Sequence, residues 1–346
     1  MSIASHKIQT PRLKIHYLER EGEGDTVILI HGNASSSIFW KDVMRRLPSK
    51  YRVIAPDMRG YGDTEDLVID ATRGFGDAVD DILSLMDSLH IQKAHFAGHS
   101  MGGGMVFTLL AEFSERMLSA MVINPASPYG FGGTKDIAGT PTAPDFAGSG
   151  GGTVNAEFAK LIKEGDRSSD NPQASPRVVM NTFYWKAPFQ APNEEELLDS
   201  VLSMKIGDDR YPGDFEASEH YPFVAPGKFG PINAASPKYN RDIPQAIVKA
   251  AQKPPVLWVR GSDDMIVSDE SMFDFASLGK MGLVPDYPGV DVCPPQPMLA
   301  QTRNVLAQYA KNGGKFTEIV MEDTGHSPFI EKPEEFMNHF LSHLDS

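Results

Sequence analysis

The 346-residue chain has 46 acidic and 32 basic residues, a net charge of −14, and ordinary globular fractions of hydrophobic (41%) and charged (23%) residues. This composition excludes a wholly disordered or fibrous chain, and without a Lys/Arg cluster we expect neither nucleic acid nor a membrane surface as partner. The single cysteine, Cys293, cannot form an internal disulfide, so we expect a cytoplasmic protein. We find no apolar run of signal-peptide or membrane-span length.

Short apolar runs alternate with helical patterns in the first and last parts of the chain. After an alternating stretch over 7–19, strands are predicted at Thr26–His31, Tyr51–Pro56, Ala94–Gly98, Ala120–Asn124, Val256–Arg260 and Phe316–Met321. Apolar residues spaced three and four apart predict helices at Phe39–Leu47, Phe75–Leu89, Met101–Phe113 and Glu334–Leu344. Strands that alternate with helices form βαβ units, so we predict an α/β fold with a mostly parallel central sheet flanked by helices.

The alternation is interrupted once by a long segment of different texture. Over 127–249 the chain is first rich in Gly, Pro, Ser and Thr and then dense in aromatic residues. We therefore predict a core formed by 1–126 and 250–346, with a cap or lid inserted at 127–249 that packs over it. A second irregular stretch, at 279–297, interrupts the last two units of the core.

The run Gly98-His99-Ser100-Met101-Gly102 lies between a predicted strand and a predicted helix. A G-x-S-x-G pattern alone is weak evidence, but the strand–turn–helix context strengthens it. The turn forces the serine into a strained conformation, and the glycines two residues before and after it remove Cβ atoms that would clash. We predict that Ser100 is a nucleophile exposed above the sheet edge, next to a helix N-terminus that favours negative charge.

Five motifs in this order resemble those of the α/β-hydrolase superfamily, in its branch with a core and a cap. They are His31-Gly32-Asn33, Asp57-Met58-Arg59-Gly60-Tyr61-Gly62, the run GHSMGG at 98–103, Gly261-Ser262-Asp263-Asp264 and Gly325-His326. The resemblance covers the predicted core and implies the fold and a catalytic machinery, but no particular substrate. It also implies that the second motif is structural, with Arg59 paired to a carboxylate.

Serine needs a base to become nucleophilic at neutral pH, and the base needs an orienting acid. His326 lies between the last predicted strand and the last predicted helix, at the same sheet edge as the serine, and we expect it to be the base. The preceding strand ends at two carboxylates, Asp263 and Asp264. In the resembled family the acid falls three residues after the glycine, which favours Asp264 and leaves Asp263 as the alternative. Some relatives carry the acid after the sixth strand, where this chain has Asn124.

The tetrahedral intermediate of such a reaction needs two preorganised hydrogen-bond donors. One is expected to be the backbone N–H of Met101, the residue after the nucleophile. The family pattern places the other at the backbone N–H of Asn33. The run around Asn33 also resembles haloalkane dehalogenases, which, like the related epoxide hydrolases, use an aspartate nucleophile. Serine at position 100 argues against both chemistries.

We therefore predict a serine hydrolase that cleaves a carboxylic ester or lactone through an acyl-enzyme on Ser100, without a cofactor or metal. The aromatic cap favours a bulky, largely apolar small molecule. Its candidate wall consists of Phe183, Tyr184 and Trp185, unless these form the cap's own core, together with His99, which the resemblance places in a wall or structural position. The oligomeric state stays open.

Three other functions fit the same triad. Relatives that hydrolyse a carbon–carbon bond of a dienoic ketoacid usually have a glycine-rich loop after His-Gly, whereas this chain has Asn-Ala-Ser-Ser-Ser there. A cofactor-free peroxidase or perhydrolase would react through a peracid. A slow-turnover receptor or regulatory binding protein would retain the triad while releasing product slowly.

Overall fold

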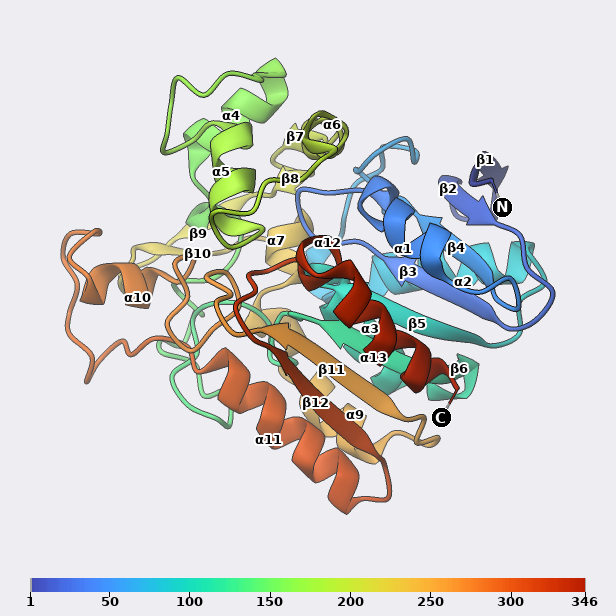
Figure 1. Cartoon of the computed structure of the whole chain (residues 1–346). Helices are drawn as coiled ribbons and strands as arrows, with labels where there is room; N and C mark the ends of the chain where they lie inside the picture. The colour runs from blue at the N-terminus through green and yellow to red at the C-terminus, as the bar shows by residue number, and fades with distance from the viewer. Residues whose placement is uncertain (1, 346) are drawn as a thin grey trace.

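The structure is a computed structural model that describes residues 2–345. Its centre is an eight-stranded sheet in the order β1-β2-β4-β3-β5-β6-β11-β12 (Figure 1). The strands are β1 (Ala4–Gln9), β2 (Lys14–Arg20), β3 (Thr26–Ile30), β4 (Arg52–Pro56), β5 (Ala94–His99), β6 (Met117–Ile123), β11 (Val256–Gly261) and β12 (Phe316–Met321). Only β2 pairs antiparallel with its neighbours β1 and β4, and all other pairs in this sheet are parallel. The predicted α/β fold with a mostly parallel sheet is confirmed.

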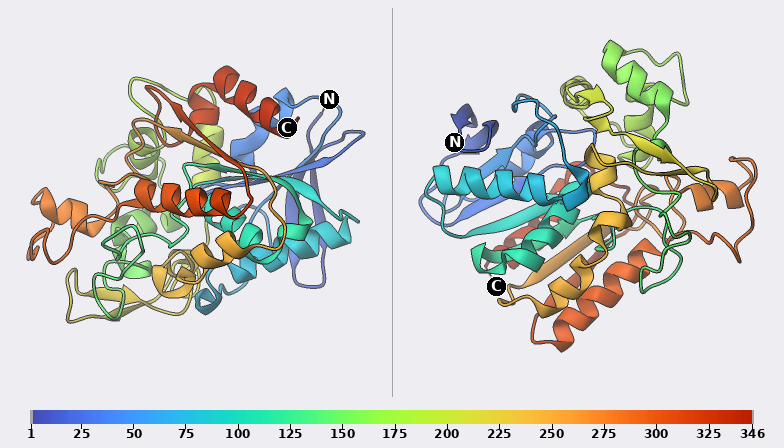
Figure 2. Two further views of the ribbon diagram at one scale, coloured as in Figure 1. Left: turned by 90° about the horizontal axis from the view of Figure 1, so that it is seen from below. Right: turned by 180° about the vertical axis from the view of Figure 1, so that it is seen from behind.

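Helices cover both faces of this sheet. Figure 2 shows α1 and α13 on one face and α2, α3 and α9 on the other, with α11 beside α9. These helices are α1 (Lys41–Arg46), α2 (Gly76–Ser88), α3 (Met101–Glu112), α9 (Ile243–Lys249), α11 (Met298–Lys311) and α13 (Pro333–Leu344). Because both faces are covered, β3 and β5 are buried along their whole length, which explains why their sequences are continuous apolar runs.

Helix α11 is not among the helices predicted from the sequence. Its buried face includes the polar side chains of Gln301 and Thr302 beside Val305 and Leu306. Polar residues on the inner face blur the apolar spacing by which an amphipathic helix is recognised. The helix also begins directly after the Pro-rich irregular stretch at 279–297, which obscures where it starts.

The segment predicted as a cap lies between β6 and the end of α9 and contacts the loops that follow β3 and β11. Figure 1 shows it in green to yellow beside one end of the sheet. Its short elements are α4 (Ala156–Glu164), α5 (Pro176–Phe183), α6 (Glu194–Leu202), β7 (Ile206–Gly207), β8 (Tyr211–Pro212), β9 (Phe215–Ala217), β10 (Val224–Pro226), α7 (Pro231–Ala234) and α8 (Pro237–Asn240). Helix α9, within the same range, packs against α3 and α11.

Two further short helices, α10 (Phe275–Lys280) and α12 (Pro328–Glu331), lie in the C-terminal part of the chain. Among residues 2–345, none of the helices combines the length and the apolar character that crossing a bilayer requires.

Candidate active site

Ser100 occupies the turn between β5 and α3 with a φ of 56°. This left-handed conformation is strained for a residue that carries a Cβ atom. The turn is held by the Ser100 backbone, whose N–H donates to the Ile123 carbonyl at 2.9 Å. A Cβ atom on Gly98 would lie 2.3 Å from the Gly102 carbonyl oxygen, and one on Gly102 would lie 2.5 Å from the Ile30 carbonyl oxygen. The predicted need for both glycines is therefore confirmed.

His326 and Asp264 form a buried hydrogen-bonded pair. The distance from His326 Nδ1 to Asp264 Oδ2 is 2.8 Å, and the side chains are 3% and 2% exposed. Asp264 Oδ1 also accepts the backbone N–H groups of Ile266 at 2.8 Å and Val267 at 3.1 Å. Asp264 therefore contacts three donors, and because Nδ1 of His326 is one of them, Nε2 is the ring nitrogen that does not face this carboxylate.

The neighbouring carboxylate, Asp263, points elsewhere. It is 38% exposed and pairs with the Lys186 ammonium at 2.8 Å. This ion pair, with a hydrogen bond from Ser262, lowers the pKa of Asp263. Of the two aspartates left open by the sequence, Asp264 is the one that contacts His326.

Two buried side chains fix the backbone of His326. His99 Nε2 donates to the His326 carbonyl at 2.8 Å, and Asn124 Nδ2 donates to the same oxygen at 2.7 Å. Burial, followed by the neighbouring imidazole of His326, holds the pKa of His99 well below its usual value, so His99 is a neutral donor. Asn124 also binds the Gly325 carbonyl and, through Oδ1, the Gly261 N–H at 3.0 Å. Asn124 thus links the ends of β6 and β11 to the histidine loop.

Ser100 lies directly next to this cluster. It follows His99, whose ring centroid is 4.6 Å from that of His326. The hydrogen bond from Ser100 Oγ to His326 is not among those formed within residues 2–345. Serine-to-base contacts are often loose in ligand-free enzymes and tighten when substrate binds. The structure therefore joins His326 to Asp264 directly and brings Ser100 beside them.

The loop after β3 is packed against the same serine. A Cβ atom on Gly32 would lie 3.0 Å from Ser100 Cβ, and Asn33 is the next residue. The Asn33 side chain is fixed by Tyr61, whose hydroxyl donates to Asn33 Oδ1 at 2.9 Å. The Asn33 side chain is therefore held by a protein group. The backbone N–H of Met101 lies in the first turn of α3, where a helix offers no internal acceptor.

Comparison with known proteins identifies the family. Residues 25–287 match the model of the alpha/beta hydrolase fold. The chain belongs to this family. The resemblance stated from the five sequence motifs is thereby confirmed.

Curated relatives of this α/β hydrolase match over shorter stretches. A 2-hydroxy-6-oxo-6-phenylhexa-2,4-dienoate hydrolase of Comamonas testosteroni is 35% identical over 115 residues, which are 32% of this chain and 40% of the relative. Human epoxide hydrolase 4 is 29% identical over 134 residues, which are 38% of this chain and 37% of the relative. The chain thus spans about 40% of the length of these relatives.

Solved structures match the α/β hydrolase over nearly all of its length. The esterase EaEST of Exiguobacterium antarcticum has a TM-score of 0.60 at 17% identity, and the match covers 99% of this chain and 100% of the esterase. The N-acyl homoserine lactonase AidH has a TM-score of 0.53 at 22% identity and coverages of 99% and 96%. At these identities the matches show the shared fold.

The three aromatic residues predicted as a substrate wall lie in different surroundings. Tyr184 OH donates to the carbonyls of Asn33 at 3.2 Å and Ala34 at 3.0 Å, so Tyr184 braces the loop beside Ser100. Trp185 is 1% exposed and packs edge-on against Phe189. Phe183 is half-buried and meets the exposed ring of Phe273 edge-on, with 4.9 Å between centroids. Whether these residues contact substrate stays a prediction.

Lys186 connects the 127–249 segment to the loops that carry Asp264 and His326. Its ammonium pairs with Asp263 at 2.8 Å and Asp323 at 2.6 Å, and its backbone N–H donates to Glu331 at 2.9 Å. The other oxygen of Glu331 accepts the Gly325 N–H at 2.8 Å, and burial raises the pKa of Glu331. The sequence did not predict these contacts of Lys186 and Glu331, because the motifs identify the loops but not the side chains that bind them.

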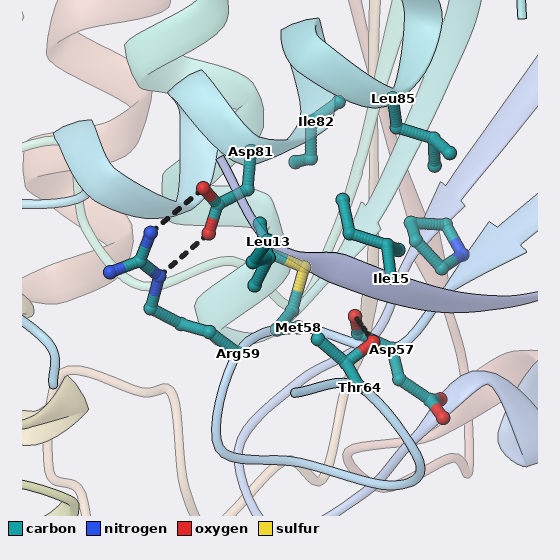
Figure 3. Close-up of a pocket in the computed structure, with 10 residues that line it drawn as sticks. Leu13, Ile15, Asp57, Met58, Arg59, Thr64, Asp81, Ile82 and Leu85 are labelled. Atoms are coloured by element: carbon teal, nitrogen blue, oxygen red, sulfur yellow. Dashed lines mark hydrogen bonds and ion pairs between the residues drawn. The ribbon is translucent and has the colours of Figure 1, made fainter. Parts of the chain in front are cut away.

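The pairing of Arg59 with a carboxylate, expected for the Asp57–Gly62 run, is confirmed. Figure 3 shows Arg59 paired with Asp81 of α2, with 2.6 Å between Arg59 Nε and Asp81 Oδ2 and 2.8 Å between Arg59 Nη2 and Asp81 Oδ1. The same figure shows Thr64 bound to the Asp57 carbonyl at 2.7 Å. The buried Arg59–Asp81 pair anchors the loop that contains Tyr61, and Tyr61 binds Asn33.

Proposed function

We propose that this α/β hydrolase cleaves a carboxylic ester or lactone through an acyl-enzyme on Ser100. The observation that carries the proposal is the strained turn at Ser100 next to the buried Asp264–His326 pair. Strands β5, β6, β11 and β12 are parallel neighbours, so the loops that carry these three residues meet at one edge of the sheet.

The reaction follows from the geometry of these groups. Nε2 of His326 takes the proton of Ser100 Oγ while the oxygen attacks the substrate carbonyl carbon. Asp264 keeps Nδ1 protonated and stabilises the imidazolium that forms. The backbone N–H groups of Asn33 and Met101 bind the oxyanion, and the N-terminus of α3 favours its charge. His326 then protonates the leaving alkoxide, and water releases the acyl group by the same steps.

One observation favours a second candidate reaction, the hydrolysis of a carbon–carbon bond. Three curated hydrolases of 2-hydroxy-6-oxo-dienoates match stretches of 115–116 residues at 34–35% identity. Their matched part is 40% of their length, so the resemblance supports a shared scaffold and leaves the substrate to experiment.

The test combines labelling and a substrate panel. An alkyl fluorophosphonate should modify Ser100, which lies in the tryptic peptide 94–116. The rate of turnover should then be measured for p-nitrophenyl butyrate, an aliphatic lactone and 2-hydroxy-6-oxo-6-phenylhexa-2,4-dienoate. Faster turnover of the ester or lactone supports the proposal, and faster turnover of the dienoate supports the second candidate. Lack of label in the 94–116 peptide would contradict both.

A further inference from the structure

A second serine, histidine and aspartate are joined at the far edge of the sheet. Ser5 Oγ lies 2.9 Å from His16 Nε2, and His16 Nδ1 lies 2.6 Å from Asp57 Oδ2. Ser5 is on β1, His16 is on β2, and Asp57 directly follows β4. These are the two contacts by which a hydroxyl is coupled to a base and the base to an orienting carboxylate, a constellation recognised by geometry rather than by sequence order.

The inner part of this relay is built like a functional site. The side chains of His16 and Asp57 are 7% and 3% exposed. Asp57 also accepts the backbone N–H of Ser37 at 2.8 Å and of Asp63 at 2.9 Å. Although burial opposes it, the hydrogen bond from His16 and the further donors lower the pKa of Asp57. The ionised carboxylate therefore holds the proton on Nδ1 of His16, and Nε2 is left to accept from the Ser5 hydroxyl.

The outer part of the relay is open to reagents. Ser5 is exposed on β1, the outermost strand of the sheet, which Figure 1 shows at the edge beside the N-terminus. Lys7 lies on the same face two residues further along the strand, and its ammonium is 3.1 Å from Asp63. Figure 3 shows the Asp57 carboxylate directed away from the Arg59–Asp81 pair.

This relay is separate from the one at Ser100. Strands β2, β4 and β3 lie between β1 and β5. Ser5 sits within a strand and precedes no helix, so it lacks the helix N-terminus that Ser100 has for stabilising an oxyanion. An activated donor has a good leaving group and can acylate the hydroxyl without that stabilisation, whereas hydrolysis of the resulting serine ester depends on it, so the adduct persists.

We propose that Ser5 is a second, surface nucleophile that is modified by activated acyl or phosphonyl donors and retains the group. With an aryl ester, a bond forms between Ser5 Oγ and the acyl carbon, and the bond from that carbon to the aryloxide breaks. The Ser5 proton passes to Nε2 of His16 and then to the departing aryloxide. With a fluorophosphonate, the P–F bond breaks instead and the proton leaves with fluoride.

The experiment uses the full-length Ser100→Ala protein and an alkyl fluorophosphonate. Trypsin releases a peptide that ends at Lys7 and contains both Ser2 and Ser5, so fragmentation of one peptide compares the activated serine with an exposed one. Because a positioned base contributes about 10²-fold or more, we expect Ser5 to be labelled about 100 times faster than Ser2. Equal labelling of the two serines, or no adduct on Ser5, would overturn the proposal.

A second variant tests the role of the base. In the protein with Ser100 intact, His16→Gln should abolish the adduct on Ser5 while the melting temperature and the adduct on Ser100 persist. An undiminished Ser5 adduct in this variant would contradict activation by His16. Because Ser5 and Ser100 fall in different tryptic peptides, failure at one site is read separately from failure at the other.

Discussion

Replacing Asn124 by alanine tests how the histidine loop is held. The Asn124 side chain is 1% exposed and joins three segments, because it donates to the carbonyls of His326 and Gly325 and accepts from the N–H of Gly261. Alanine removes all three hydrogen bonds at once. The His326 carbonyl keeps its second donor, His99.

The expected cost follows from the groups left behind. The Gly261 N–H and the Gly325 carbonyl belong to buried residues and lose the Asn124 side chain as a partner. A buried polar group without a partner costs about 1–3 kcal/mol, so the variant should lose about 2–6 kcal/mol of unfolding free energy. A shift of about 1 Å in a catalytic group costs on the order of 10²-fold in rate, so kcat should fall by about 10- to 100-fold.

Urea unfolding and ester hydrolysis measure the two effects on the same samples. A matched control is Asn312→Ala, which removes an exposed amide whose bond is made to Gln308 in its own helix end. We expect this control to change the unfolding free energy by less than about 0.5 kcal/mol and to leave kcat unchanged. If Asn124→Ala and Asn312→Ala behave alike in both assays, Asn124 does not hold the histidine loop.

Three further outcomes are expected. Asp264→Asn should lower kcat by about 10⁴-fold in initial-rate assays, because this carboxylate contacts His326. Asp263→Asn removes a half-exposed carboxylate and should leave kcat unchanged. Similar losses of kcat in the two variants would contradict the choice of Asp264. Gly102→Ala should cost about 1–3 kcal/mol in urea unfolding, since its Cβ would lie 2.5 Å from two carbonyl oxygens, whereas Gly207→Ala, with no neighbour closer than 3.5 Å, should be tolerated. Burial lowers the pKa of His343 to about 4, so the unfolded chain binds its proton first as the pH falls below about 6.5, and stability should drop by on the order of 3 kcal/mol towards pH 4. His343→Gln should flatten this decline, and an unchanged decline would argue against it.

Most of the core could be predicted because its strands are buried on both faces. The apolar runs at Thr26–His31 and Ala94–Gly98 correspond to β3 and β5 with one residue of difference at an end. The alternating stretch over 7–19 resolves into two strands, β1 and β2, since an edge hairpin with one exposed strand carries a weaker signal.

In the candidate site, residues in local motifs could be predicted, and residues whose contacts join distant segments could not. Ser100, Asp264 and His326 could be named as candidates because each belongs to a local strand-end motif, and chain order suggests their roles, which stay a proposal. Asn124 and Tyr61 were not predicted as site residues, because their contacts join segments distant in sequence. Asn124 carried one signal, its place after the sixth strand, where some relatives have the acid.

The relay at Ser5 has no sequence motif. The contact between Ser5 and His16 depends on the pairing of β1 with β2, in which Ser5 faces Leu18 and Lys7 faces His16. The contact with Asp57 depends on the further pairing of β2 with β4. A shift of one residue in either register would turn the side chains to opposite faces of the sheet.

The proposed function requires one event above all, the attack of the Ser100 hydroxyl on the substrate. The most direct test is the steady-state hydrolysis of p-nitrophenyl acetate by Ser100→Ala, measured in a Ser5→Ala background so that only the first site is compared. We predict a loss of kcat/KM of at least about 10³-fold with an unchanged melting temperature. Retention of kcat/KM within about tenfold of the Ser5→Ala parent would contradict the proposed function.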